Sequence, residues 1–124
     1  MKFQNIIITI LLVTIAGTAF SASVPKGKET LTFKSKTGTV TFHHKRHADL
    51  SFTKCTTCHH TWDGKEKMKA CKECHKKSDD VMAPKKKTAF HTRCSGCHEY
   101  TVSQGKKAGP QPKECKLCHI KANG

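Results

Sequence analysis

Branched aliphatic residues are scarce in this 124-residue sequence once its first 22 positions are set aside. Those that remain are Val24, Leu31, Val40, Leu50, Val81, Val102, Leu117 and Ile120. Ordering each residue costs about 1–2 kcal/mol of backbone entropy, which so few side chains cannot offset across the chain. Small domains of this kind rely on disulfides, metals or cofactors. The eight cysteines and nine histidines are the obvious candidates for such a role.

Long apolar runs are also lacking, except at the N-terminus. Ile6 to Ala19 is almost wholly apolar, follows a basic start, and precedes the small residues Ser21 and Ala22. The run is shorter than the ~20 residues that a membrane-spanning helix needs. This layout predicts a secretory signal peptide over residues 1–22, cleaved after Ser21 or Ala22. An uncleaved membrane anchor is the alternative. We expect one domain over residues 23–124, in the periplasm and without a transmembrane segment.

Acidic residues are few, with 9 Asp and Glu against 23 Lys and Arg, which gives a formal net charge of +14. A balance this basic suggests an acidic partner, nucleic acid or a membrane surface. Secretion argues against nucleic acid, so we expect no nucleic-acid partner.

Secondary-structure signals are weak outside one segment. Apolar and polar residues alternate on both sides of a turn at Lys36-Thr37-Gly38, which predicts a β-hairpin. Its shared face would carry Leu31, Phe33, Val40 and Phe42. The stretches Lys76–Lys87 and Gln104–Lys113 are rich in Lys, Gly and Pro and predict surface loops. The expected fold class is small and mostly irregular or α, with short helices and this N-terminal hairpin.

Every cysteine of the chain belongs to a Cys-x-x-Cys-His motif. The four motifs are Cys55–His59, Cys71–His75, Cys94–His98 and Cys115–His119. They form a weak repeat, and repeats this short cannot each bury a face alone. The pattern suggests one cofactor for each unit.

Cys-x-x-Cys-His is the attachment signature of c-type haem. Two cysteines three positions apart lie on one side of a helical turn, where both sulfurs reach the vinyl groups of one porphyrin. The adjacent histidine then binds the iron. We therefore predict four covalently bound haems c, attached by Cys55, Cys58, Cys71, Cys74, Cys94, Cys97, Cys115 and Cys118, with His59, His75, His98 and His119 as iron ligands. Two zinc ions held by the eight cysteines, or four disulfides, are the alternatives.

The second ligand of each iron decides the chemistry, because an open position allows small-molecule binding and a filled one favours electron transfer. Five histidines lie outside the motifs, namely His43, His44, His47, His60 and His91. They could supply a second ligand to each of four irons, with one histidine remaining. Met68 and Met82 are further candidates, and a methionine ligand would raise the potential. The histidine supply favours four irons with two histidine ligands each.

These features resemble the class III cytochromes c, the low-potential tetrahaem periplasmic carriers of anaerobic bacteria, and their trihaem relatives. The resemblance covers Leu31 to Ile120 and includes the doubled histidine His59-His60 and the closing motif Cys115–His119. The family's Phe-x-His-x-x-His element falls on Phe42, His44 and His47. Many tetrahaem members have a longer Cys-x-x-x-x-Cys-His at the second and fourth sites, whereas all four motifs here are Cys-x-x-Cys-His.

By this resemblance, the non-motif histidines each serve one iron. His44 would be the second ligand at the first haem, His60 at the second, His47 at the third and His91 at the fourth. His43 would be left over. The implied fold is a multihaem cytochrome fold built around a haem core.

The resemblance also implies a monomeric electron carrier that passes electrons between redox enzymes in anaerobic respiration. Its partners would be hydrogenases or membrane-associated multihaem cytochromes. It would not be an enzyme, although adventitious metal reduction is compatible with such haems. The alternative is a multihaem reductase of a metal ion or small oxyanion at an open iron. Lysines near Lys65–Lys77, Lys85–Lys87 and Lys106–Lys116 would steer acidic partners or neutralise haem propionates.

Overall fold

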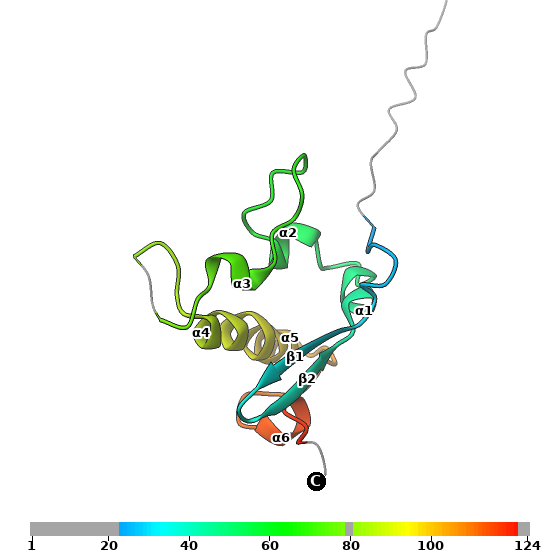
Figure 1. Ribbon diagram of the computed structural model, residues 1–124. Coiled ribbons are helices and arrows are strands. Elements are labelled where there is room, and N and C mark those ends of the chain that lie inside the picture. The colour runs from blue at the N-terminus through cyan, green and yellow to red at the C-terminus, as the bar shows by residue number, and fades with distance from the viewer. Residues whose placement is uncertain (1–22, 79–80, 122–124) are drawn as a thin grey trace, which may run out of the picture.

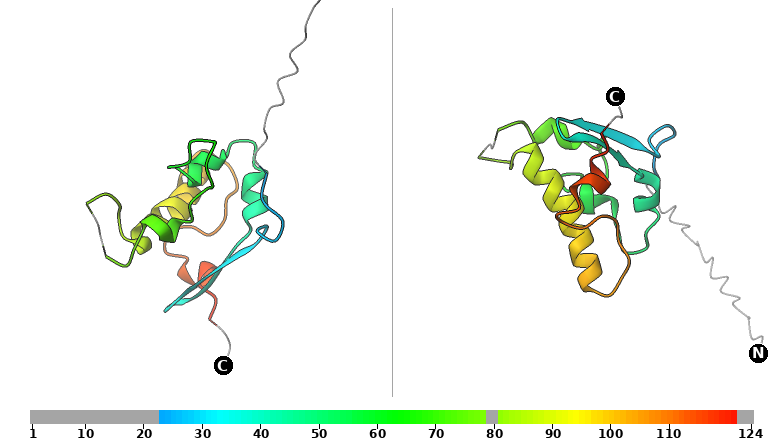
Figure 2. Two further views of the ribbon diagram at one scale, coloured as in Figure 1. Left: turned by 45° about the horizontal axis from the view of Figure 1, so that its top comes forward. Right: turned by 90° about the horizontal axis from the view of Figure 1, so that it is seen from below.

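A two-stranded hairpin and several one-turn helices surround one helical rod (Figure 1). The computed structural model describes residues 23–78 and 81–121, so the predicted signal peptide over 1–22 lies outside the described residues. Helices α2 (Cys55–Cys58) and α3 (Cys71–Cys74) lie on one side of the rod, which spans residues 86–103, and α6 (Cys115–Cys118) lies beside the hairpin. The two views of Figure 2 show the hairpin and α6 side by side. Among the described residues, no helix has the length and apolar character required to cross a bilayer.

The predicted hairpin is confirmed. Strand β1 (Leu31–Ser35) pairs antiparallel with β2 (Gly38–Phe42), and Leu31 faces Phe42 while Phe33 faces Val40. Because side chains alternate along a strand, these four residues share one face. That face is half-buried, whereas Thr32 and Thr41 on the opposite face are exposed. The hairpin therefore turns its apolar side toward the rest of the chain.

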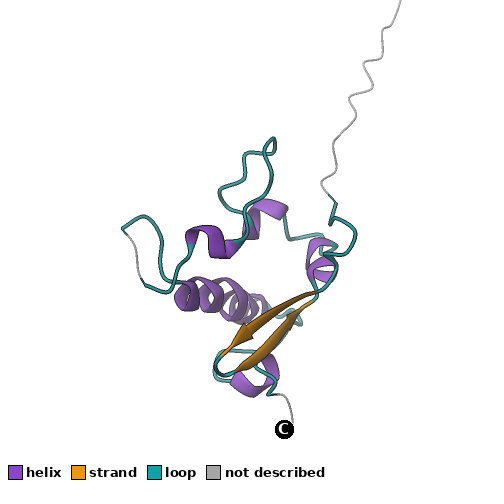
Figure 3. Cartoon of the chain, viewed as in Figure 1, coloured by secondary structure: helices purple, strands orange, loops and turns teal. Residues whose placement is uncertain are grey.

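Three of the four Cys-x-x-Cys segments form a helix of a single turn. These are α2 (Cys55–Cys58), α3 (Cys71–Cys74) and α6 (Cys115–Cys118), while α1 (His44–Ala48) follows the hairpin (Figure 3). In α2, α3 and α6, the backbone N–H of the motif histidine donates to the carbonyl of the first cysteine, at 2.8–2.9 Å. The chain leaves helical geometry at that histidine. The short helices predicted at these motifs are thus confirmed.

The third motif differs because it lies inside a continuous helical rod. Helix α4 (Lys86–His91) runs into a π-helical segment η1 (Thr92–Gly96) and then into α5 (Cys97–Ser103). The predicted loop Lys76–Lys87 was therefore wrong at its end, since Lys86 and Lys87 begin the rod. Wider π turns are rare and occur often at functional sites. Here the π segment carries Cys94, between His91 and His98.

The polypeptide has no hydrophobic core of its own within the described residues. No apolar side chain there is buried, and the two most enclosed residues are His75 and Thr101, each 8% exposed. Aromatic rings make the main apolar contacts instead. Phe33 packs edge-on against Phe90 of α4, with ring centres 5.1 Å apart, and lies 6.3 Å from Phe42. This scarcity of buried apolar surface agrees with the scarcity of aliphatic residues in the sequence.

Gly38 is required where the hairpin meets the C-terminal segment. Its φ of +134° is a conformation that side chains rarely adopt, and an added Cβ would lie 2.8 Å from the backbone oxygen of Ile120. We expect Gly38→Ala to lower the free energy of unfolding by about 3 kcal/mol, the upper range for a strained backbone. Guanidinium chloride unfolding of the purified protein, followed by circular dichroism, measures the change.

Gly64→Ala is the matched control for this prediction. Gly64 also has a positive φ, +89°, but nothing lies within 4 Å of the added Cβ. The Gly64→Ala substitution should lower the free energy of unfolding by about 1–2 kcal/mol, from backbone strain alone. A Gly38→Ala variant as stable as Gly64→Ala would contradict the contact between the hairpin and the C-terminal segment.

Candidate functional site

Each motif histidine lies opposite a histidine from outside the motifs. The ring centres are 6.1 Å apart for His44 and His59, and 5.9 Å apart for His60 and His75. The other two pairs are His47 with His98, at 6.2 Å, and His91 with His119, at 6.1 Å. His43 lies outside these pairs. All eight candidate ligand histidines are therefore brought together two by two.

The spacing of the rings matches the geometry of one metal ion held between two imidazoles. A metal–imidazole nitrogen bond is about 2.0 Å long, so two rings on opposite sides of one ion have centres about 6 Å apart. Rings in direct contact can lie closer than this, as the 4.5 Å between the tilted rings of Phe42 and His47 illustrates. The donor set therefore fits a planar metal group that already fills four positions and takes two more ligands.

The paired histidines come from distant parts of the chain. The hairpin leads directly into His44 and His47 of α1, which reach the first and third motifs. His91 at the end of α4 reaches the last motif. The pairing thus closes loops between the N-terminal, central and C-terminal segments, which few other contacts connect.

Hydrogen bonds orient most of these rings. Six of the paired histidines donate from Nδ1 to a backbone carbonyl, which leaves Nε2 free to bind a metal. The distances run from 2.7 Å for His75 with Pro84 to 3.4 Å for His59 with Lys69, and the remaining bonds are His44 with Lys28, His47 with His43, His91 with Lys87 and His98 with Pro110. His119 instead bonds the hydroxyls of Ser35 and Thr37.

The cysteine thiols are unpaired. All eight are free, so the structure contains none of the disulfides considered as an alternative. Desolvation raises the pKa of the Cys94 thiol to about 11, and the charges of Cys58, Cys71, Cys118 and Cys97 act in the same direction. Those four thiols represent every motif of the chain. Desolvation likewise raises the pKa of Cys58. Cysteines of all four motifs therefore act on the pKa of Cys94.

A zinc module is disfavoured by the same arrangement. Structural zinc takes four protein ligands arranged as a tetrahedron. Within residues 23–78 and 81–121, no three side chains of His, Cys, Asp or Glu converge in a way that would hold an ion. Each site instead offers the two cysteines and one histidine of a haem c attachment motif, with a second histidine as a further possible iron ligand.

Comparison with known proteins agrees with this donor set. The model of the "Class III cytochrome C family" matches residues 18–119. A cytochrome c3 of Maridesulfovibrio salexigens is 40% identical over 91 residues, which cover 66% of this chain and 78% of that protein. A cytochrome c7 of Geobacter metallireducens is 30% identical over 111 residues, covering 90% and 97%. The solved structure of PpcE, a cytochrome c7 from Geobacter sulfurreducens, is 32% identical, covers 73% of this chain and 96% of its own, and superposes with a TM-score of 0.44.

This chain belongs to the class III cytochrome c family. It is a multihaem cytochrome that carries electrons and holds covalently bound haem c. Its relatives are electron-transfer proteins rather than enzymes, which confirms that prediction. The fold class predicted from the sequence, short helices with an N-terminal hairpin, is confirmed as well.

Sequence reasoning missed the residues of this cytochrome that support the ligands. Pro84 and Pro110 supply carbonyl oxygens to His75 and His98. Gly109 lies against His98, where an added Cβ would come within 2.6 Å of the ring. Backbone acceptors have no signature in sequence, and a glycine in a Lys-, Gly- and Pro-rich stretch predicts only a loop. These contacts are visible only once the chain is folded.

The close contact between Gly109 and His98 leads to a prediction. Gly109→Val should push the His98 ring out of position and convert about one haem per chain from low spin to high spin. Electron paramagnetic resonance of the oxidised protein measures this conversion. Ala108→Val adds a similar side chain at the neighbouring exposed position and should leave every haem low spin. Equal high-spin signals in the two variants would contradict this role for Gly109.

Proposed function

We propose that this protein is a periplasmic carrier with four haems c, each iron bound by two histidines. The domain spans residues 23–124, after a signal peptide over 1–22. It passes electrons between redox enzymes in anaerobic respiration, with hydrogenases or membrane-associated multihaem cytochromes as partners. The observation that carries the proposal is the pairing of every motif histidine with a second histidine at 5.9–6.2 Å.

The residues divide into four sets, one for each haem. Each set holds the two cysteines of a motif, the motif histidine and one outside histidine. In chain order of the motifs, the outside ligands are His44, His60, His47 and His91. Haem c supplies an iron that accepts and releases single electrons. The cysteines would hold the haem through thioether bonds, and the two histidines would bind its iron.

Filled axial positions favour the carrier over the reductase alternative. A reductase of a metal ion or oxyanion requires one iron with an open or weakly held position. None of the four motif histidines lacks a ring partner. Two nitrogen ligands also favour the ferric state more than a methionine does, so low potentials are expected.

Haem quantitation and carbon monoxide binding test this proposal together. The mass of the mature protein should exceed that of its polypeptide by four haems, and the reduced protein should bind no carbon monoxide. His91→Ala should bind one carbon monoxide per chain, because it opens one iron. His43→Ala is the control and should bind none, since His43 lies outside the pairs. His44→Ala provides a second opened site if His91→Ala does not assemble.

Two results would contradict the proposal. Fewer than four haems on the mature protein would overturn the count. Carbon monoxide binding by the unmodified reduced protein would show an open iron and favour the reductase.

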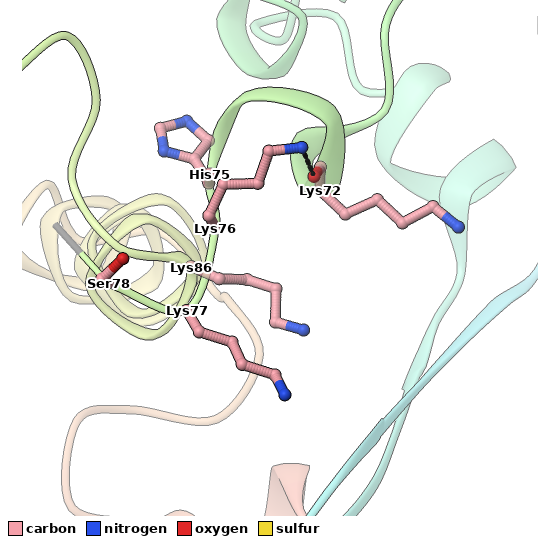
Figure 4. A pocket seen from close by; sticks show the side chains of 6 residues that line it. All are labelled: Lys72, His75, Lys76, Lys77, Ser78 and Lys86. Atoms are coloured by element: carbon pink, nitrogen blue, oxygen red, sulfur yellow. Dashed lines mark hydrogen bonds between the residues drawn. The ribbon is translucent and has the colours of Figure 1, made fainter. Parts of the chain in front are cut away.

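A lysine-rich pocket beside His75, next to the proposed second haem, offers positive charge to an acidic partner or to the haem propionates. The pocket, of about 400 Å³, is lined by Lys72, His75, Lys76, Lys77, Ser78 and Lys86 (Figure 4). The backbone N–H of Lys86 donates to the carbonyl of Lys76 at 2.7 Å, which holds the two ends of the lysine-bearing loop together. The side-chain amines of Lys77 and Lys86 extend to the same side. No acidic residue is among those that line the pocket.

The pocket leads to a salt-dependent prediction. Replacing Lys77 and Lys86 by Gln should slow reduction by an acidic protein donor several-fold at low ionic strength, because steering depends on charge. Above about 0.5 M salt the difference should vanish, because the Debye length shrinks to a few ångströms. Stopped-flow absorbance measures the rates. The pair Lys34→Gln and Lys36→Gln, on the hairpin, changes the net charge equally, and an equal slowing there would contradict docking at this pocket.

A further inference from the structure

His119 differs from the other paired histidines in what its ring bonds. Its Nδ1 lies 3.2 Å from Oγ of Ser35 and 3.1 Å from Oγ1 of Thr37. Six of the other paired rings bond backbone carbonyls. His119 thus differs from these six rings in bonding hydroxyl groups. The two residues stand 84 and 82 positions away in sequence.

The fold holds the two hydroxyls against His119. Thr39 and Ile120 form an antiparallel bridge, with the N–H of Thr39 donating to Ile120 at 2.8 Å and the reverse bond at 3.0 Å. Gly38 has no Cβ that would prevent this approach. The hairpin turn is thereby held beside the C-terminal end of α6 (Figure 1). His119 follows directly after this helix.

The hydrogen-bond network determines which atom donates. The Ser35 hydroxyl donates to the carbonyl of Gly38 at 2.8 Å, so it cannot also donate to the ring. The Thr37 hydroxyl lies 2.9 Å from Ser35 Oγ and can donate there. An iron-bound His119 uses Nε2, which leaves the proton on Nδ1. The ring N–H therefore donates to the pair of hydroxyl oxygens.

We propose that Ser35 and Thr37 are positioning residues that set the redox potential of the Cys115–His119 haem through the Nδ1–H of His119. The inference rests on the proposed haem ligation. A hydrogen bond from Nδ1 makes the imidazole a more basic ligand, and a more basic ligand stabilises ferric iron. Loss of both hydroxyls weakens that bond and moves the potential of this haem upward. The hairpin thus acts on the fourth haem through its turn, in addition to presenting His44 and His47 at its end.

The test uses the haem-loaded protein with Ser35→Ala and Thr37→Val combined. Both changes are neutral in charge, and Val has nearly the shape of Thr. Stepwise reduction followed by nuclear magnetic resonance of the haem methyl groups gives the potential of each haem separately. The potential of the Cys115–His119 haem should rise relative to the other three. Its axial Nδ1–H should also exchange faster with solvent.

Two companion variants separate this role from a structural one. Thr37→Ser in a Ser35→Ala background keeps one hydroxyl in reach and should restore part of the shift. Thr41→Val makes the same replacement on the exposed face of the hairpin and should move no potential. Single Thr37→Val, with the shift expected in the same direction, replaces the double variant if that variant does not assemble.

The outcomes distinguish the inference from the function on which it rests. Four haems with an unchanged potential at the Cys115–His119 haem would overturn the role of the hydroxyls and leave the carrier intact. An equal shift at all four haems would mean that the hairpin had merely loosened, which also overturns it. Fewer than four haems on the unmodified protein would overturn the proposed function itself.

Discussion

The proposed coordination of each iron by two histidines is the interaction on which the rest of the fold depends. A chain with no buried apolar side chain among its described residues cannot offset the entropy of folding by hydrophobic burial. In the proposed ligation, attachment at two cysteines and coordination by two histidines would fix four chain positions around each cofactor. Within the described residues, the contacts between segments are otherwise few, with the hairpin and α6 the main long-range pair outside the β-sheet. The proposal therefore implies that folding and cofactor attachment are coupled.

The hairpin shows how few regular elements are needed to organise such a molecule. Its apolar face packs Phe33 against Phe90, its end presents His44 and His47, and its turn contacts His119. A single element thus reaches three of the four histidine pairs. The helical rod contributes to two histidine pairs, because His91 and the third motif both lie on it. Local structure serves here to place ligands rather than to bury surface.

The motifs and the hairpin could be predicted from sequence because each is local. Cys-x-x-Cys-His fixes its own helical turn, and the alternation from Leu31 to Phe42 fixes its own strand pairing. Sequence could not show that the third motif lies in a continuous helix, since its spacing is that of the other motifs and Gly96 is unfavourable in a helix. It also could not show the hydroxyl contacts at His119 or the carbonyl acceptors, which join positions far apart. The pairing of His44, His47, His60 and His91 came from family resemblance and remains a proposal that the ring distances support.

The central claim is that all four irons have two histidine ligands. Quantitative electron paramagnetic resonance of the fully oxidised, unmodified protein tests it most directly, alongside total iron. The account predicts low-spin signals of the bis-imidazole type whose integrated intensity equals four irons per chain. A high-spin signal amounting to one iron per chain, or a total iron content below four, would contradict it.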